Sequence, residues 1–123
     1  MTAVDVPGWL SELYSLVDAA ALDDYLERFY SDDAELRFGS APAVRGRAAV
    51  REALGAGHDR HAMEHTFVNV WTVDDTTICE FRVRYTMRAD ARVVELPSLA
   101  ILRRQPDGLL DQLRVYIDPA PLH

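Results

Sequence analysis

The fold is decided in the second half of the chain, most clearly in the stretch TICEFRVRYTMR at residues 77–88. Apolar and polar side chains alternate along it, and a period of two is typical of a β-strand with one buried face. The same period recurs at about 62–72, 93–104 and 109–118. Turn residues separate these stretches at Asp74-Asp75 and Pro106-Asp107-Gly108. Four successive strands of this kind predict antiparallel pairing, and Pro97 predicts a bulge or edge position.

The first half of the chain has a helical period instead. Apolar residues at spacings of three and four predict helices at about 8–20 and 22–29, and a third from Gly46 that Gly55 and Gly57 end. A short strand at 34–38 is expected between the second and third helices. Helices followed by an antiparallel sheet indicate the α+β class, and we expect one domain over residues 1–123.

Composition argues against several classes of function. The chain of 123 residues carries a net charge of -7, which opposes binding to a nucleic-acid backbone. Its single cysteine, Cys79, cannot form an internal disulfide, and no stretch approaches the ~18 apolar residues of a membrane span. We therefore expect a soluble cytoplasmic protein with no nucleic-acid or membrane partner. No phosphate loop or dinucleotide fingerprint occurs, so we expect no cofactor.

Three short motifs resemble the nuclear-transport-factor-2-like superfamily, particularly its SnoaL-like branch of polyketide cyclases, limonene epoxide hydrolases and ketosteroid isomerases. They are Tyr30-Ser31-Asp32-Asp33-Ala34, His65-Thr66-Phe67-Val68-Asn69, and Asp107-Gly108-Leu109 followed by Arg114-Val115-Tyr116-Ile117-Asp118-Pro119. The resemblance covers nearly the whole chain. It implies a cone-shaped, curved sheet, mixed or antiparallel, that three N-terminal helices close into an apolar pocket, and a homodimer that forms through the outer face of the sheet.

The resemblance also suggests catalytic residues. Asp118 matches the water-activating Asp of the limonene-epoxide-hydrolase relatives, and Arg82 matches their Arg. Arg84, however, stands where their paired Asp should be, and Leu36 and Phe38 replace the Tyr and Asn that hold the water. This pattern argues against standard epoxide hydrolysis.

Two further relatives bear on the choice of acid and base. Phe38 and Ala100 stand where ketosteroid isomerases carry their two acids, which excludes isomerisation by that route. His65 matches the catalytic His of scytalone-dehydratase-like members, and an imidazole with a reference pKa of about 6.5 suits proton transfer. The competing interpretation is structural for both candidates: a hydrogen-bonded His65, and an Asp118 that holds the C-terminal tail.

Side-chain direction in the strand at 77–88 decides whether Arg82 reaches the pocket. The usual arrangement buries Phe81, Val83 and Tyr85 and leaves Arg82 and Arg84 in solvent. The alternative turns the arginines inward and leaves the apolar residues to a dimer interface. Because the period is two, a single bulge decides between the two arrangements.

Other residues are candidates for the pocket wall. Tyr14 and Asp18 lie one turn apart on the first helix, and Tyr14 is either a stabiliser of negative charge or a core residue. His58 and His61 suggest a metal site, but His61 and Glu64 point to opposite strand faces, so we expect no metal. The candidate substrate-binding residues are Phe29, Phe38, Phe67, Asn69, Trp71, Tyr85, Ala100 and Tyr116.

The leading hypothesis is a cofactor-free enzyme that acts by acid and base chemistry on a small apolar carbonyl, epoxide or polyketide-like substrate, as an isomerase, cyclase, dehydratase or epoxide hydrolase. Asp118 and His65 share the acid and base roles, and Arg82 or Tyr14 stabilises developing negative charge. This requires Asp118 and His65 to face one dry chamber. One alternative is a non-catalytic ligand-binding or dimeric module. Another is an assembly role of the outer sheet surface, which Leu113, Val115 and Ile117 supply if they form an outer apolar stripe and not part of the core.

Overall fold

Three helices and a six-stranded sheet make up the fold in a computed structural model that describes residues 4–123. The helices are α1 (Gly8–Asp18), α2 (Leu22–Phe29) and α3 (Arg47–Arg60), and a 3-10 turn, η1 (Ala120–Leu122), lies near the C-terminus. The strands are β1 (Tyr30–Phe38), β2 (Val44–Arg45), β3 (His61–Val73), β4 (Thr76–Met87), β5 (Val93–Arg104) and β6 (Leu110–Tyr116). This arrangement confirms the α+β class.

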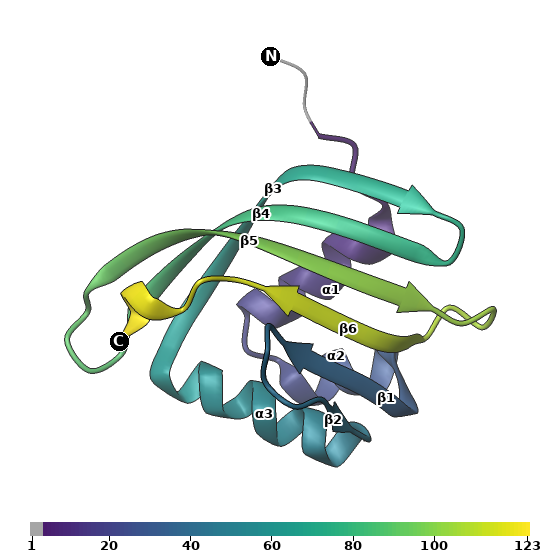
Figure 1. Ribbon diagram of the computed structural model, residues 1–123, viewed down its shortest axis with the longest axis horizontal. Helices are drawn as coiled ribbons and strands as arrows, with labels where there is room; N and C mark the ends of the chain where they lie inside the picture. The colour runs from purple at the N-terminus through teal and green to yellow at the C-terminus, as the bar shows by residue number, and fades with distance from the viewer. Residues whose placement is uncertain (1–3) are drawn as a thin grey trace.

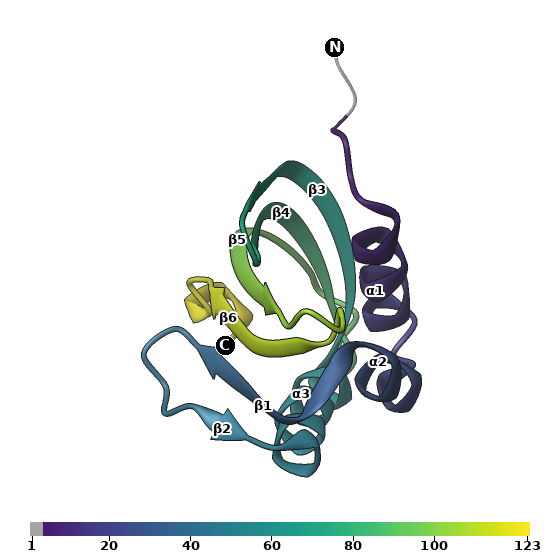
Figure 2. The same cartoon turned by 90° about the vertical axis from the view of Figure 1, so that its right-hand side faces the viewer.

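The sheet is mixed and open, with the strand order β2-β1-β6-β5-β4-β3. Only β1 and β6 run parallel, and the four strands of the second half pair antiparallel as predicted. The strands curl strongly, with α1 and α2 along one side and α3 across one end (Figures 1 and 2). The curvature gives the sheet an inner face toward the helices and an outer face away from them.

A β-bulge in β3 decides which of its side chains face the helices. Phe67 pairs with Phe81, but the next partner pair is Asn69 with Glu80, so Val68 is an extra residue. Because side chains alternate, one extra residue exchanges the two faces beyond it. Residues 61, 63, 65 and 67 therefore point inward, whereas 69 and 71 point outward.

The neighbouring strands keep a regular alternation. In β4, Phe81, Val83 and Tyr85 are buried, and Arg82 and Arg84 are exposed, as the usual arrangement predicts. The register between β4 and β5 is continuous across Pro97, and β6 reaches only as far as Leu99. At Pro97, β5 therefore has a neighbouring strand, β4, on one side only. This agrees with the predicted edge position.

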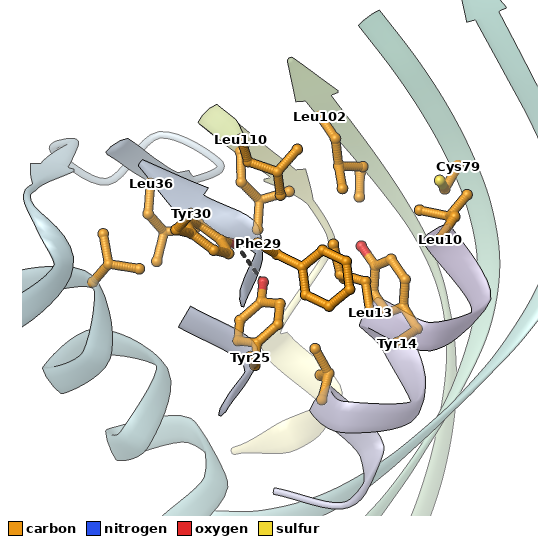
Figure 3. Close-up of a cluster of buried hydrophobic side chains, with 14 of the residues drawn as sticks. Leu10, Leu13, Tyr14, Tyr25, Phe29, Tyr30, Leu36, Cys79, Leu102 and Leu110 are labelled. Atoms are coloured by element: carbon orange, nitrogen blue, oxygen red, sulfur yellow. Dashed lines mark hydrogen bonds between the residues drawn. The ribbon is translucent and has the colours of Figure 1, made fainter. Parts of the chain in front are cut away.

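A cluster of buried side chains joins α1 and α2 to the sheet (Figure 3). Leu10 and Leu13 of α1 are fully buried, and Tyr25 of α2 is almost so. Removing each such side chain from water contributes ~1.5–3 kcal/mol. The hydroxyls of Tyr25 and Tyr30 share a hydrogen bond inside this cluster, so neither is left unpaired. The packing fixes α1 against the sheet, and α1 carries Tyr14 and Asp18.

Two predicted boundaries are wrong. α3 continues through Gly55 and Gly57 to Arg60, because both glycines keep helical geometry and His58 beyond them is buried. Tertiary contacts thus outweigh the ~1 kcal/mol that a helical glycine costs. β1 begins at Tyr30 rather than at residue 34, because Tyr30, Ser31 and Ala34 are all buried.

Candidate functional site

A cavity of about 540 Å³ lies between the inner face of the sheet and the helices. That volume falls in the range of sites that hold small molecules. Most of the wall is apolar. Val17 of α1 and Leu22 of α2 line it on the helical side. The other side includes Leu113 and Val115 of β6 and Ile117, which follows β6. The sequence leaves open whether those last three residues form an outer stripe or part of the core. They line the cavity, because odd-numbered positions of this segment point inward.

A few polar side chains interrupt this apolar wall. Tyr14 comes from α1, His58 from α3, His61 and His65 from β3, Tyr85 from β4 and Ser98 from β5. Convergent polar groups in an otherwise apolar cavity are typical of a binding or catalytic site.

His65 and Asp18 form the best-defined polar pair in the cavity wall. The Nδ1 of His65 lies 2.6 Å from Oδ1 of Asp18, and the backbone N–H of His65 donates to Oδ2 at 2.9 Å. The side chain of His65 is only 10% exposed. A carboxylate only accepts hydrogen bonds, so Nδ1 carries the hydrogen and Nε2 keeps its lone pair in the neutral ring.

Tyr14 lies beside this pair. Its ring centroid is 4.9 Å from that of His65 and 4.6 Å from that of Phe81. Burial raises the pKa of Tyr14 well above its usual value, and the negative charges that Tyr25, Cys79 and Asp18 can carry add to this effect. Tyr14 therefore remains a protonated hydrogen-bond donor at neutral pH.

Asp118 does not face the cavity, so the predicted pairing of Asp118 with His65 is wrong. Its side chain is exposed and accepts a hydrogen bond from the backbone N–H of Ala120 at 3.1 Å. Asp118 follows the end of β6 and occupies the outward position between Ile117 and Pro119, which both line the cavity. Its carboxylate therefore binds the backbone of the C-terminal tail, as the structural alternative predicts.

Arg82 also lies outside the cavity. Its side chain is 61% exposed on the outer face, 3.9 Å from Glu95. Because β4 carries no bulge at this point in its pairing with β5, the alternation that buries Phe81 and Val83 directs Arg82 outward. Its expected role as a stabiliser of charge in the cavity is wrong.

The predicted substrate-binding residues divide by strand face. Phe38, Tyr85 and Ala100 line the cavity. Phe67 points inward but packs behind the wall, 5.7 Å from Tyr14 and 4.9 Å from Phe81 between ring centroids. Phe29 is buried in the core beside the cavity and not in its wall.

Three predicted substrate-binding residues lie on the outer face, which corrects their assignment. Asn69 donates a hydrogen bond to Glu80 at 2.7 Å, and Trp71 is 47% exposed. Both follow the bulge at Val68, which turns them away from the helices. Tyr116 is 43% exposed because, beyond the register shift near the start of β6, its even-numbered positions point outward.

The sequence indicated Asp18 only as a polar group near Tyr14, and not as the partner of His65. The two residues lie 47 positions apart, and no local pattern links them. Among residues 4–123, no three His, Cys, Asp or Glu side chains are grouped so as to hold a metal ion. No helix in that range is long and apolar enough to cross a membrane.

Solved structures with the same fold cover most of the chain at low sequence identity. A predicted polyketide cyclase from Xanthomonas campestris pv. campestris is 18% identical, with a TM-score of 0.84 over 94% of this chain and 91% of the other. A predicted isomerase from Bacillus subtilis is 18% identical, with a TM-score of 0.79 over 90% and 84%. SalBIII, an epoxide hydrolase/cyclase-like enzyme of pyran ring formation in salinomycin, is 19% identical, with a TM-score of 0.75 over 89% and 88%.

These likenesses establish the nuclear-transport-factor-2-like fold. A protein of that fold and of unknown function from Burkholderia pseudomallei K96243 has a TM-score of 0.80 at 13% identity, over 91% of this chain and 89% of the other. No curated protein matches the sequence. The family model described as the SnoaL-like domain matches residues 10–112, which include most of α1, His65 and all of β4. The chain belongs to the SnoaL-like domain family.

Proposed function

We propose that the protein is a cofactor-free enzyme that removes and returns a proton next to the carbonyl group of a small apolar substrate. The observation that carries this proposal is the hydrogen-bonded pair of His65 and Asp18 in the wall of a mostly apolar cavity, with Tyr14 beside it. The pair takes the place of Asp118 and His65, since Asp118 is exposed.

His65 acts as the general base. Its Nδ1–H donates to Asp18, which fixes the ring and leaves the Nε2 lone pair to accept a proton from the carbon next to the carbonyl. As the C–H bond breaks and the N–H bond forms, the electron pair moves onto the carbonyl oxygen. The carboxylate of Asp18 stabilises the imidazolium that results.

Tyr14 stabilises the enolate oxygen. Its hydroxyl remains protonated at neutral pH because burial raises its pKa, so it donates a hydrogen bond to the developing negative charge. Tyr14 and His65 come from different elements, and the 4.9 Å between their rings allows both to reach one bound molecule. The apolar surroundings strengthen both interactions by excluding water.

The fate of the enolate sets the reaction type. Return of the proton from His65 to another carbon gives isomerisation. Expulsion of a hydroxyl from the neighbouring carbon, which His65 protonates as it leaves, gives dehydration. Attack of the enolate carbon on a second carbonyl of the same molecule, whose oxygen then takes the proton, gives cyclisation. Epoxide hydrolysis is less well supported, because neither Asp118 nor Arg82 lies in the cavity.

The test uses 2-tetralone, a compact apolar ketone with acidic protons at C1, dissolved with the protein in D₂O. We expect exchange of the C1 protons by NMR, and a loss of ~10²-fold or more in His65→Gln, because a positioned general base contributes about that factor. The matched control is His123→Gln, which changes an exposed histidine. Equal exchange in the wild type and His65→Gln would contradict the proposal.

A binding module is the second candidate. The apolar wall and the absence of acids at Phe38 and Ala100 favour it, since these residues can hold a ligand but cannot transfer protons. It predicts that 2-tetralone binds the wild type with no exchange above that of buffer.

A further inference from the structure

A hydroxyl that the proposed reaction does not use lies in the cavity wall on β5. Ser98 pairs directly with Phe81 of β4, and Phe81 points inward, so Ser98 projects from the same inner face of the sheet. Its neighbours on that face of β5 are Leu96 and Ala100, which are apolar and buried. Ser98 is itself only 8% exposed and lines the cavity. It is therefore a small polar group within an apolar part of the wall.

The hydroxyl of Ser98 has no protein partner, yet the cavity gives access to it. Within residues 4–123, no protein atom forms a hydrogen bond with its Oγ. The side-chain atoms of this range that are both unpartnered and fully enclosed are the Nε2 of His58, the Nδ1 of His61 and the Nε of Arg114. The Oγ of Ser98 is not one of them, so it keeps accessible surface. Strand β6 pairs with β5 no further than Leu99, so Ser98 has a neighbouring strand on one side only.

An unpartnered hydroxyl in this place needs a partner from the cavity. Buried polar groups are rarely left unpaired, because each loses its hydrogen bonds to water. An alanine at this position would fill almost the same space without that cost. The partner is a neutral group, because a carboxylate would enter an apolar part of the wall with a single uncharged hydroxyl to bind it.

We propose that Ser98 is a specificity-determining residue that binds a hydroxyl group of the substrate, away from the reacting carbon. The position of the reacting carbon near His65 rests on the proposed function, whereas binding at Ser98 does not require catalysis. A hydroxyl both donates and accepts hydrogen bonds, and so does the side chain of Ser98. A substrate hydroxyl therefore uses the hydrogen-bonding capacity of Ser98 more fully than a carbonyl oxygen, which only accepts.

The sheet separates this hydroxyl from the reacting end of the substrate. His65 on β3 pairs with Val83 of β4, and Ser98 on β5 pairs with Phe81 of the same strand. Two strand spacings and two residues along the strand place the Cα atoms of His65 and Ser98 ~12 Å apart. Both side chains line the cavity and occupy part of that distance. A bicyclic molecule with a ketone on one ring and a hydroxyl on the other suits the gap that remains.

The test measures the binding of 2-tetralone, and of its four isomeric derivatives with one hydroxyl on the aromatic ring, by isothermal titration calorimetry on the whole chain. We expect at least one derivative to bind Ser98→Ala ~5- to 10-fold more weakly than the wild type, as the loss of one hydrogen bond would cause. 2-Tetralone itself should bind both proteins equally, since it has no group for Ser98. The control Ser11→Ala makes the same change at an exposed serine outside the cavity and should keep every affinity.

Two further measurements separate ligand binding from folding and from catalysis. Without ligand, Ser98→Ala should unfold at or above the wild-type temperature, because its hydroxyl forms no hydrogen bond within the protein. The weaker binding caused by Ser98→Ala should also appear in a His65→Gln background, in which proton exchange is lost. Failure of the proposed reaction is thereby distinguishable from failure of the binding role of Ser98.

Several results would overturn the role of Ser98. They are an unchanged affinity of Ser98→Ala for all four derivatives, an equal loss of affinity for 2-tetralone, the same loss in Ser11→Ala, and no binding of any of the ketones. A lower unfolding temperature of Ser98→Ala would also contradict it, since that result would give Ser98 a structural role.

Discussion

The two faces of the sheet use the same strands for different purposes. The inner face carries Phe81 and His65 and encloses the cavity, while the outer face carries Arg82 and Asn69 in contact with acidic neighbours. Residues next to each other in sequence thus lie in opposite environments. The difference teaches that the direction of a side chain, more than its residue type, decides whether it can contact a molecule in the cavity. Asp118 and Arg82 have suitable acid and charge chemistry, but both point away from the cavity.

The largest expected effect tests this division at adjacent positions. Phe81→Ala should lower the free energy of unfolding by ~3–5 kcal/mol, because Phe81 is 1% exposed and its loss leaves a void among aromatic neighbours. Arg82→Ala should change it by less than ~0.5 kcal/mol, since Arg82 is exposed. Urea denaturation measures both, and a similar loss for the two variants would contradict the assignment of faces.

Periodicity predicted the strands and the faces of β4 because a regular alternation is visible in the residues themselves. It placed Asn69 and Trp71 on the wrong face because Val68, the extra residue of the bulge, looks like any other strand residue. The bulge arises from the pairing with β4, which involves residues distant in sequence. The His65–Asp18 pair was missed for the same reason, since only the packing of α1 against β3 brings the two together.

The next test concerns the outer face of the sheet. The family resemblance implies a homodimer through that face, and this dimer stays a prediction. Trp71 and Tyr116 are exposed there, and Trp71 pairs across strands with Ile78, which pairs with Ile101. We expect light scattering to give a dimer mass at micromolar concentration and a monomer mass for Trp71→Glu, since a buried charge would weaken the interface. A wild-type monomer mass at two concentrations would contradict the dimer.

A smaller effect should appear in the pH dependence of stability. The pKa of His58 is below 6.5 in the folded protein, chiefly through burial, so the unfolded chain binds a proton more readily as the pH falls below 6.5. Stability is therefore lost on acidification through this window. His58→Gln should lose less stability than the wild type between neutral pH and mildly acidic pH in thermal unfolding. An identical pH dependence in both proteins would show that His58 is not held neutral.

The most direct test of the account compares two carboxylates, Asp18 at the cavity and Asp118 outside it, in the exchange of 2-tetralone protons in D₂O. Asp18→Asn keeps the shape and removes the charge that orients His65, so we predict a loss of ~10²-fold or more. Asp118→Asn should exchange at the wild-type rate, because that side chain is exposed and only accepts a hydrogen bond from the backbone N–H of Ala120. A large loss in Asp118→Asn with an unaffected Asp18→Asn would contradict the account.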